Sequence, residues 1–200
     1  MSRRLVRVWL EPDTGAGQLE TVLARALGIS ANEVVVDSTC VDCGRAHGKP
    51  RVVRPRAADG REIVVSKSGV AGRVAIAVSL DRGELGVDLE SLVQMSRARV
   101  DEAAFSSAER DLIDDADPAS RAELRTRLWS RKEAYLKASG VGLRVDLTTV
   151  DLASGFAADA VFVDVPTGDP RLVLSVAMLG SEPVTVEVVS ELAAAREDAR

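Results

Sequence analysis

Apolar side chains recur along the chain at two spacings, and these spacings predict a mixture of strands and helices. Runs of β-branched residues between turn residues predict strands, and apolar positions three and four residues apart predict helices. Residues 18–27 have the helical spacing, with Leu19, Val22 and Leu23 on one side and Gly28 as the expected stop. The expected strands are residues 5–10, 33–37, 63–65, 74–80, 85–90, 171–179 and 184–189.

Two Ser-x-x-Glu sequences predict helix starts in the second half of the chain. Ser and Glu at this spacing form a capping box, in which each side chain accepts a hydrogen bond from the other residue's backbone N–H. Ser106 and Glu109 begin a short helix, and Ser120 and Glu123 begin a longer one that ends at Gly140. The chain therefore combines helices and strands without regular alternation.

A strand, turn, strand pattern occurs twice, at residues 74–90 and 171–189, and each copy is expected to be a hairpin. The two copies share their pattern and not their residues. We expect an α+β fold of two similar halves related by a pseudo-twofold axis, with the active site between them. The expected parts are an N-terminal half of residues 1–90, a C-terminal half of residues 91–190 and a frayed tail of residues 191–200.

Two stretches between these elements are expected to be loops. Residues 38–60 are rich in Cys, Gly, Pro and Arg, and residues 66–69, Ser-Lys-Ser-Gly, contain a glycine directly after a short strand. Such composition is typical of loops, which often carry binding residues. We therefore expect ligand contacts from both stretches.

Composition excludes several classes of protein. The 200 residues carry a net charge of −5, and 3% of them are aromatic, so a basic groove lined with stacking rings for nucleic acid is not expected. No run approaches the ~20 apolar residues of a membrane helix, and the N-terminal apolar run is too short for secretion. With two cysteines the chain is not a disulfide scaffold. We expect a cytoplasmic monomer that binds neither membranes nor nucleic acid.

The chain has 22 arginines but only four lysines, which are Lys49, Lys67, Lys132 and Lys137. A lysine ammonium is a compact, strongly hydrated charge that arginine does not replace well. In a chain so biased toward arginine, the lysines therefore mark candidate functional positions.

Three carboxylates are candidate ligands for a cation. Asp88 and Glu90 are two residues apart in an expected strand, so both side chains leave the same face. Paired oxygen ligands of this kind suit Mg²⁺, although a solvated strand face has the same pattern. Glu133 lies on the long helix between apolar neighbours, and Lys137 follows four residues later. The simpler interpretation of that second pair is a surface ion pair.

Two stretches carry a resemblance to a known family. Residues 85–90, Leu-Gly-Val-Asp-Leu-Glu, and 129–137, Trp-Ser-Arg-Lys-Glu-Ala-Tyr-Leu-Lys, are similar to the paired signature of the 4′-phosphopantetheinyl transferases. Phe105-Ser106 with Glu109, His47-Gly48-Lys49-Pro50 and residues 66–69 also resemble the family pattern. The resemblance covers about residues 40–142 and is strongest to the two-domain members that activate peptide and polyketide synthetases in secondary metabolism.

The resemblance implies Mg²⁺-dependent transfer of the 4′-phosphopantetheine arm from coenzyme A to a serine of an apo acyl or peptidyl carrier protein. Asp88, Glu90 and Glu133 would surround the metal, Glu133 would instead or also accept the serine proton, and Lys137 would offset charge on the leaving group. The residues implied in coenzyme A binding are His47, Lys49, Pro50, Arg51, Ser66, Lys67, Ser68, Gly69, Lys132 and Lys137.

The chain departs from the family pattern in two ways. Lys67 stands where members usually have histidine, and the usual basic segment before the first helix is missing or much shortened. Two other interpretations therefore remain: a non-catalytic relative that binds coenzyme A or carrier protein, and a Mg²⁺-dependent phosphohydrolase using the same carboxylates.

Two further features leave alternatives open. Cys40, Cys43 and His47 have metal-ligand spacing, but a closed zinc site needs four ligands, so reduced thiols in a loop are the alternative. Residues 91–100 combine apolar side chains with Arg97 and Arg99, which would suit an acidic partner helix or, for the apolar residues, simple burial.

Overall fold

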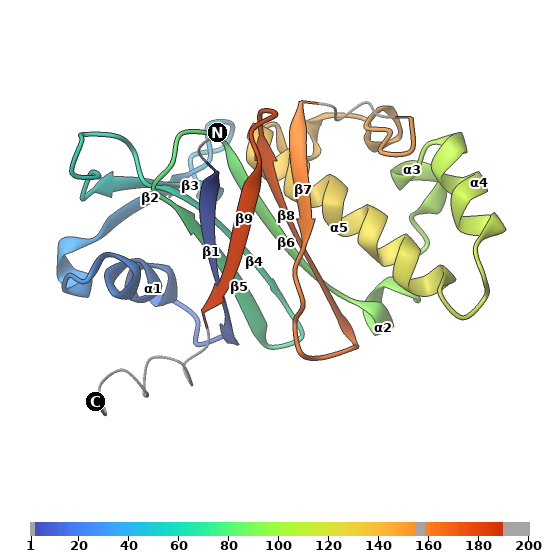
Figure 1. The fold of residues 1–200 in the computed structure, drawn as a ribbon, viewed down its shortest axis with the longest axis horizontal. Coiled ribbons are helices and arrows are strands. Elements are labelled where there is room, and N and C mark those ends of the chain that lie inside the picture. Colours follow the sequence, from blue (N-terminus) through green and yellow to red (C-terminus); the bar gives the residue numbers. More distant parts are fainter. Residues whose placement is uncertain (1–2, 155–158, 190–200) are drawn as a thin grey trace.

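The computed structural model describes residues 3–154 and 159–189, and within them the chain forms two packed sheets, a separate hairpin and several helices (Figure 1). The expected α+β fold is confirmed. The expected tail, residues 191–200, lies outside the described residues. No helix in the described part of the chain is long and apolar enough to cross a bilayer.

The first sheet has the strand order β4-β5-β1-β9. β1 pairs with β5 in antiparallel fashion and with β9 in parallel fashion. Helix α1 (Gln18–Leu27) covers one face of this sheet through Leu23, and Gly28 ends the helix at φ +66° as expected. The strands of this sheet are β1 (Arg4–Pro12), β4 (Val64–Val70), β5 (Arg73–Ser79) and β9 (Val184–Val189).

The second sheet has the order β6-β8-β7, with both pairings antiparallel. Its strands are β6 (Leu85–Ser91), β7 (Ala160–Asp164) and β8 (Leu172–Leu179). The long helix α5 (Arg121–Ser139) lies across β6 and β8 (Figure 1). The two sheets share an apolar core, in which Val87 and Val176 of the second sheet pack with Val8 and Ala77 of the first.

The two expected hairpins are wrong, although all four of their strands exist. β5 belongs to the first sheet and β6 to the second, while β8 belongs to the second and β9 to the first. Each strand, turn, strand unit therefore places one strand in each sheet. Apolar side chains of β6 pack into the core that the two sheets share, while the backbone of β6 pairs with β8. The short turn between β5 and β6 therefore does not determine which strands pair.

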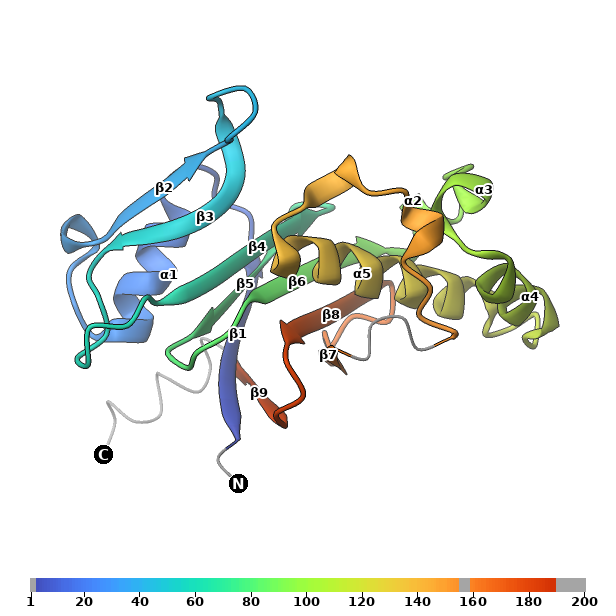
Figure 2. The ribbon, with the colours of Figure 1, turned by 90° about the horizontal axis from the view of Figure 1, so that it is seen from above.

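Nearly half of the stretch 38–60 is strand, which corrects the expectation of a continuous loop. β2 (Val35–Thr39) and β3 (Ala46–Arg54) form a two-stranded sheet of their own beside β4, and Val52 of β3 packs into the core of the first sheet (Figure 2). A short 3₁₀ helix, η1 (Ala31–Glu33), occupies the start of the strand expected from residue 33. The backbone of β3 pairs with β2, and this pairing overrides the loop-like composition of the segment.

The remaining helices pack around α5. Ser106 and Glu109 form the expected capping box at the start of α4, and Gly140 ends α5 at φ +71°. Ser120 does precede α5, but its side chain makes no capping bond, and Glu123 pairs with Arg127 instead. The elements in this region are α2 (Leu92–Met95), α3 (Asp101–Ala104), α4 (Ser107–Asp115), η2 (Gly142–Arg144) and η3 (Leu147–Thr149).

Candidate functional site

A glycine brings β6 and α5 into direct backbone contact. A Cβ atom placed on Gly86 would lie 1.9 Å from the carbonyl oxygen of Ala134, a distance that no side chain tolerates. Two residues further along β6, the hydroxyl of Ser130 on α5 donates to the carbonyl oxygen of Asp88 at 3.0 Å. This close approach places the carboxylates of β6 against the side chains of α5.

Asp88 is the centre of this contact, and its side chain has one satisfied oxygen and one that is not. Oδ1 accepts hydrogen bonds from Lys137 Nζ at 2.6 Å and from Ser68 Oγ at 2.9 Å. Oδ2 is buried and has no hydrogen-bond partner among the described residues, while Asp88 as a whole is 2% exposed. A buried carboxylate oxygen without a donor is costly unless another group compensates it.

Glu90 leaves β6 on the same face as Asp88, as the two-residue spacing predicts. One of its oxygens accepts a hydrogen bond from Trp129 Nε1 at 2.8 Å. Burial raises the pKa of Glu90 to about 7, with the negative charge of Asp88 as the next cause. Burial and then Asp88 also raise the pKa of Glu133, while Lys137 opposes that shift.

The donor chemistry of these carboxylates suits a divalent cation, whereas the side chains that already gather their ligand atoms within 4.8 Å in the described part of the chain are Cys40, Cys43 and His47. Asp88, Glu90 and Glu133 come from two elements, repel one another through their charges, and lie near the ammonium of Lys137. The unpartnered Oδ2 of Asp88 is the position at which a cation would supply the missing interaction. Carboxylate oxygens are the donors that Mg²⁺ prefers. Lys137 is also more than a surface partner of Glu133, because its Nζ binds Asp88 and Ser68.

Residues 66–69 lie within β4 and not in a loop. Their backbone is extended and paired with β5, so their N–H groups do not converge on one point as those of an anion-binding turn do. Ser66 and Ser68 both point to β6, where Ser66 Oγ accepts from the Val87 N–H at 3.0 Å. Because strand side chains alternate, Lys67 lies on the opposite face of β4. Gly69, the last of the four, is exposed.

Lys132 does not lie with the other candidate residues. Its side chain is 0% exposed, and its ammonium contacts the Glu109 carboxylate at 2.5 Å and the carbonyl oxygens of Ala104 at 2.6 Å and Leu147 at 2.9 Å. An ammonium has three donors, and all three are used. The expectation that Lys132 binds coenzyme A is therefore wrong, because this lysine holds α5 to the segments around α4 and η3.

The other candidate residues lie on β3. Lys49 reaches the Glu84 carboxylate and donates to the Ala138 carbonyl oxygen at 2.6 Å, close to the C-terminal end of α5. Arg51 is exposed and within 4.0 Å of Glu62, and Pro50 is half-buried. The ring nitrogen Nε2 of His47 lies 2.9 Å from Cys43 Sγ.

The thiols near His47 form a compact group. The ligand atoms of Cys40, Cys43 and His47 all lie within 4.8 Å of one another. Hydrogen bonds from Arg45 and then His47 lower the pKa of the Cys43 thiol to about 6.

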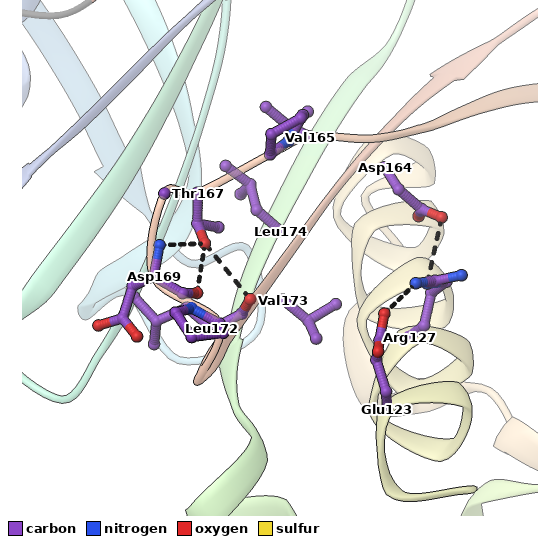
Figure 3. A pocket seen from close by; sticks show the side chains of 12 residues that line it. Glu123, Arg127, Asp164, Val165, Thr167, Asp169, Leu172, Val173 and Leu174 are labelled. Carbon is purple, nitrogen blue, oxygen red and sulfur yellow. Dashed lines mark hydrogen bonds and ion pairs between the residues drawn. The ribbon is translucent and has the colours of Figure 1, made fainter. Parts of the chain in front are cut away.

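Sequence reasoning missed a pocket of about 540 Å³ at the end of the second sheet. Figure 3 shows Arg127 between Glu123 and Asp164 on one side of this pocket. Asp164 also pairs with Arg131 at 2.7 Å, so both guanidinium groups beside it already have carboxylate partners. The one available signal was the position of Asp164 in an otherwise apolar strand. None of the expected site residues lines the pocket.

Comparison with known proteins supports the resemblance found in the sequence. Residues 84–171 match the family described as the 4′-phosphopantetheinyl transferase superfamily. This match covers less than half of the chain and supports a relationship to the superfamily, whose name describes the transfer of 4′-phosphopantetheine. The matched stretch contains Asp88, Glu90, Glu133 and Lys137, while Lys49 and residues 66–69 lie before it. No curated protein matches the chain significantly.

Proposed function

We propose that this protein uses Mg²⁺ to transfer the 4′-phosphopantetheine arm of coenzyme A to a serine of an apo acyl or peptidyl carrier protein. The observation that carries the proposal is the buried, unpartnered Oδ2 of Asp88 beside Glu90 and Glu133. In this site Asp88, Glu90 and Glu133 hold the cation. When bound, Mg²⁺ neutralises charge on the pyrophosphate of coenzyme A.

The side chains themselves account for the rest of the reaction. The serine oxygen forms a bond to the phosphorus that carries the pantetheine arm, and the pyrophosphate bond to adenosine 3′,5′-bisphosphate breaks. Burial raises the pKa of Glu133, which makes this carboxylate a better base for the serine proton. Lys137, already aligned by Ser68 and Asp88, offsets the charge on the departing bisphosphate.

We also propose that the chain is of the two-domain type, with halves at 1–90 and 91–190 and the site between them. The support is the presence of two sheets that each contain one strand from the other half. β6 of the first half lies in the second sheet, and β9 of the second half lies in the first sheet. Asp88 of β6 accepts a hydrogen bond from Ser68 of β4, which is the edge strand of the first sheet. The remaining coenzyme A contacts that we propose come from the first half: His47, Lys49, Pro50, Arg51, Ser66, Lys67, Ser68 and Gly69. Ser66 and Ser68 face β6, whereas Lys67 lies on the opposite face of β4 and is included on the family resemblance alone.

Intact mass measurement of an apo carrier protein tests the activity. Incubation with this protein, coenzyme A and Mg²⁺ should add the mass of one phosphopantetheine, and chelation of Mg²⁺ should abolish the gain. A phosphohydrolase would consume coenzyme A without changing the carrier, and a non-catalytic relative would do neither. Either result would overturn the proposed transfer.

The surface after β6 is the proposed docking site for the carrier protein. Met95 is buried, but Val93, Arg97 and Arg99 are exposed, so an apolar group and two positive charges face solvent. We expect the double substitution Arg97→Glu, Arg99→Glu to raise the KM for carrier protein several-fold and to leave the KM for coenzyme A unchanged. Steady-state kinetics with each substrate varied in turn measures this, and unchanged carrier kinetics would remove the docking assignment.

The raised pKa of Glu90 predicts pH-dependent stabilisation by Mg²⁺. The folded-state pKa, about 7, exceeds the ordinary value of 4.5, so the metal-free protein loses stability as the pH rises through this range. Above pH 7 the ionised carboxylate is available to the cation. We therefore expect Mg²⁺ to raise Tm more at pH 8 than at pH 6.

Thermal unfolding with and without MgCl₂ at the two pH values checks this expectation. The variant Glu90→Gln should lose most of the difference between the two pH values, because it has no proton to exchange. Equal Tm shifts at both pH values in the unsubstituted protein would contradict it.

A further inference from the structure

The turn of the β2–β3 hairpin gathers three side chains of the type that bind soft divalent metals. Cys40, Cys43 and His47 are the two cysteines and the one histidine of the chain, and their ligand atoms lie within 4.8 Å of one another. We propose that this turn is a structural Zn²⁺ site, with the sulfur atoms of Cys40 and Cys43 and the Nε2 atom of His47 as ligands. The other ring nitrogen of His47, Nδ1, remains available for the coenzyme A contact proposed above. The proposed transfer reaction does not use the thiols.

The backbone of the turn holds the two thiols on the same side. The Cys40 N–H donates to the Arg45 carbonyl oxygen at 2.8 Å, and the Gly44 N–H donates to the Cys40 carbonyl oxygen at 2.9 Å. Gly44 has φ +70°, a conformation that favours glycine and that closes the turn directly after Cys43. The Cys-x-x-Cys spacing is the one by which structural zinc sites take two ligands from a single turn.

A second glycine allows the histidine to reach the thiols. A Cβ atom on Gly48 would lie 2.7 Å from the Thr39 carbonyl oxygen and 3.0 Å from the Cα atom of Cys40. Only glycine therefore lets β3 approach the end of β2 directly after His47. The pairing register shifts between Asp37 and Thr39, next to this contact. The close approach puts Nε2 of His47 2.9 Å from Cys43 Sγ.

The spacing and charge of the group suit Zn²⁺. Bonds of about 2.3 Å to sulfur and 2.0 Å to nitrogen in a tetrahedron place ligand atoms roughly 3.5–3.8 Å apart, so small side-chain rotations suffice. The Asp42 carboxylate, 4.0 Å from Cys40 Sγ, is the nearest candidate for the fourth position, and water is the alternative. Arg45 donates to Cys43 Sγ at 3.4 Å, and Arg144 pairs with Asp42 at 3.2 Å. These two cations offset the excess negative charge of two thiolates and a carboxylate around Zn²⁺.

The site would join the hairpin to the end of α5. Arg144 belongs to η2, directly after α5, and Lys49 of the same hairpin donates to the Ala138 carbonyl oxygen. A metal in the turn would therefore order β3, the strand that carries Lys49. Any effect of this ordering on coenzyme A binding through Lys49 rests on the proposed function. The metal site itself does not, because it can be measured without either substrate.

Metal analysis of the full chain, purified under reducing conditions, tests the proposal. We expect one equivalent of zinc per chain, and Co²⁺ added to the metal-free protein should give the visible bands of tetrahedral cobalt together with thiolate-to-metal charge transfer. Cys43→Ser should weaken Zn²⁺ binding at least about a hundredfold, since losing even a group that only supports a ligand costs 10- to 100-fold. Asp88→Asn is the matched control: it alters the candidate Mg²⁺ site and should leave the zinc content unchanged.

A second variant separates ligand loss from disruption of the turn. Gly48→Ala keeps all three ligands but pushes β3 away from β2, so it should weaken Zn²⁺ binding and raise hydrogen exchange in the hairpin. Zinc that is substoichiometric, that a weak chelator removes, or whose cobalt derivative lacks thiolate charge transfer would overturn the proposal. A Cys40–Cys43 disulfide in the reduced, metal-supplied preparation would overturn it as well. Failure of the transfer assay would leave each of these measurements unaffected.

Discussion

Replacement of Asp88 by Asn should lower kcat/KM for carrier modification by at least about a hundredfold, the range seen when one preorganised electrostatic group is lost. The substitution preserves size and removes the charge that faces Lys137 and the proposed cation. Oδ1 of Asp88 is the acceptor for two hydrogen bonds, and Oδ2 is the oxygen that lacks a donor. An amide in this place offers one acceptor oxygen and no charge, so it cannot serve both the ammonium and a metal ion.

The measurement is the rate of phosphopantetheine addition, read by intact mass over a range of Mg²⁺ concentrations. Circular dichroism should show a folded variant, because the contact of β6 with α5 depends on Gly86 and on the Ser130 bond to the backbone, neither of which changes. Glu133→Gln should show a comparable loss. If both variants kept near wild-type turnover at saturating Mg²⁺, the carboxylate site would be wrong.

The arrangement of the candidate carboxylates was predictable in part, because the placement of Asp88 and Glu90 relative to each other is local. Side chains two residues apart in a strand lie on the same face, whichever strands it pairs with. Asp88 and Glu90 could therefore be placed together from their spacing alone. Their meeting with Glu133 on α5 is not local. It depends on the backbone contact at Gly86, and the sequence reveals it only through the resemblance to the family.

Strand pairing was not predictable in the same way. The apolar pattern identified β5, β6, β8 and β9 as strands, and the turns between them suggested two hairpins. A pattern of side chains indicates which face is buried but not which backbone it pairs with. β6 buries Val87 against the first sheet while its backbone pairs with β8 of the second, and no signal within residues 74–90 distinguishes this arrangement from a hairpin.

Composition misled the prediction where glycines and polar residues occur in strands. Residues 66–69 and most of the segment 46–54 contain few apolar side chains, and both are strands. In β4 the polar residues are retained because Ser66 and Ser68 bond to the neighbouring edge strand, whose N–H and carboxylate need partners. In β3, Gly48 permits a close approach that a side chain would prevent. Polar strands of this kind differ from loops only in their tertiary partners.

Lys132 and Lys137 look alike in the sequence and differ in the structure. Both lie on α5, and both were marked as functional because lysine is rare in this chain. The five-residue separation turns them to different sides of the helix. Lys137 reaches Asp88, and its side chain is 30% exposed, whereas Lys132 is fully buried against Glu109. The rarity of lysine therefore drew attention to both positions. It did not distinguish the lysine that stabilises the fold, Lys132, from the lysine at the candidate site, Lys137.

We expect Lys132→Met to lower the free energy of unfolding by about 3–5 kcal/mol, because Glu109 would remain buried without its cation. The methionine nearly preserves volume, so the loss reports the charge and its bonds to two carbonyl oxygens and not a cavity. Lys137→Met is the matched control on the same helix: it should cost less stability, since water can reach its site, and should reduce transfer at least about tenfold.

Urea unfolding and transfer kinetics below the unfolding range distinguish the two lysines. The folded fraction of Lys132→Met should retain the wild-type KM for coenzyme A. The buried Lys132 ammonium pairs with Glu109 and donates to the carbonyl oxygens of Ala104 and Leu147, so it has no donor left for a substrate. The double variant Lys132→Met, Glu109→Gln should recover part of the lost stability, because a neutral amide is cheaper to bury than an unpaired carboxylate. If Lys132→Met unfolded like wild type and raised the KM for coenzyme A, the buried ion pair would not describe the protein in solution.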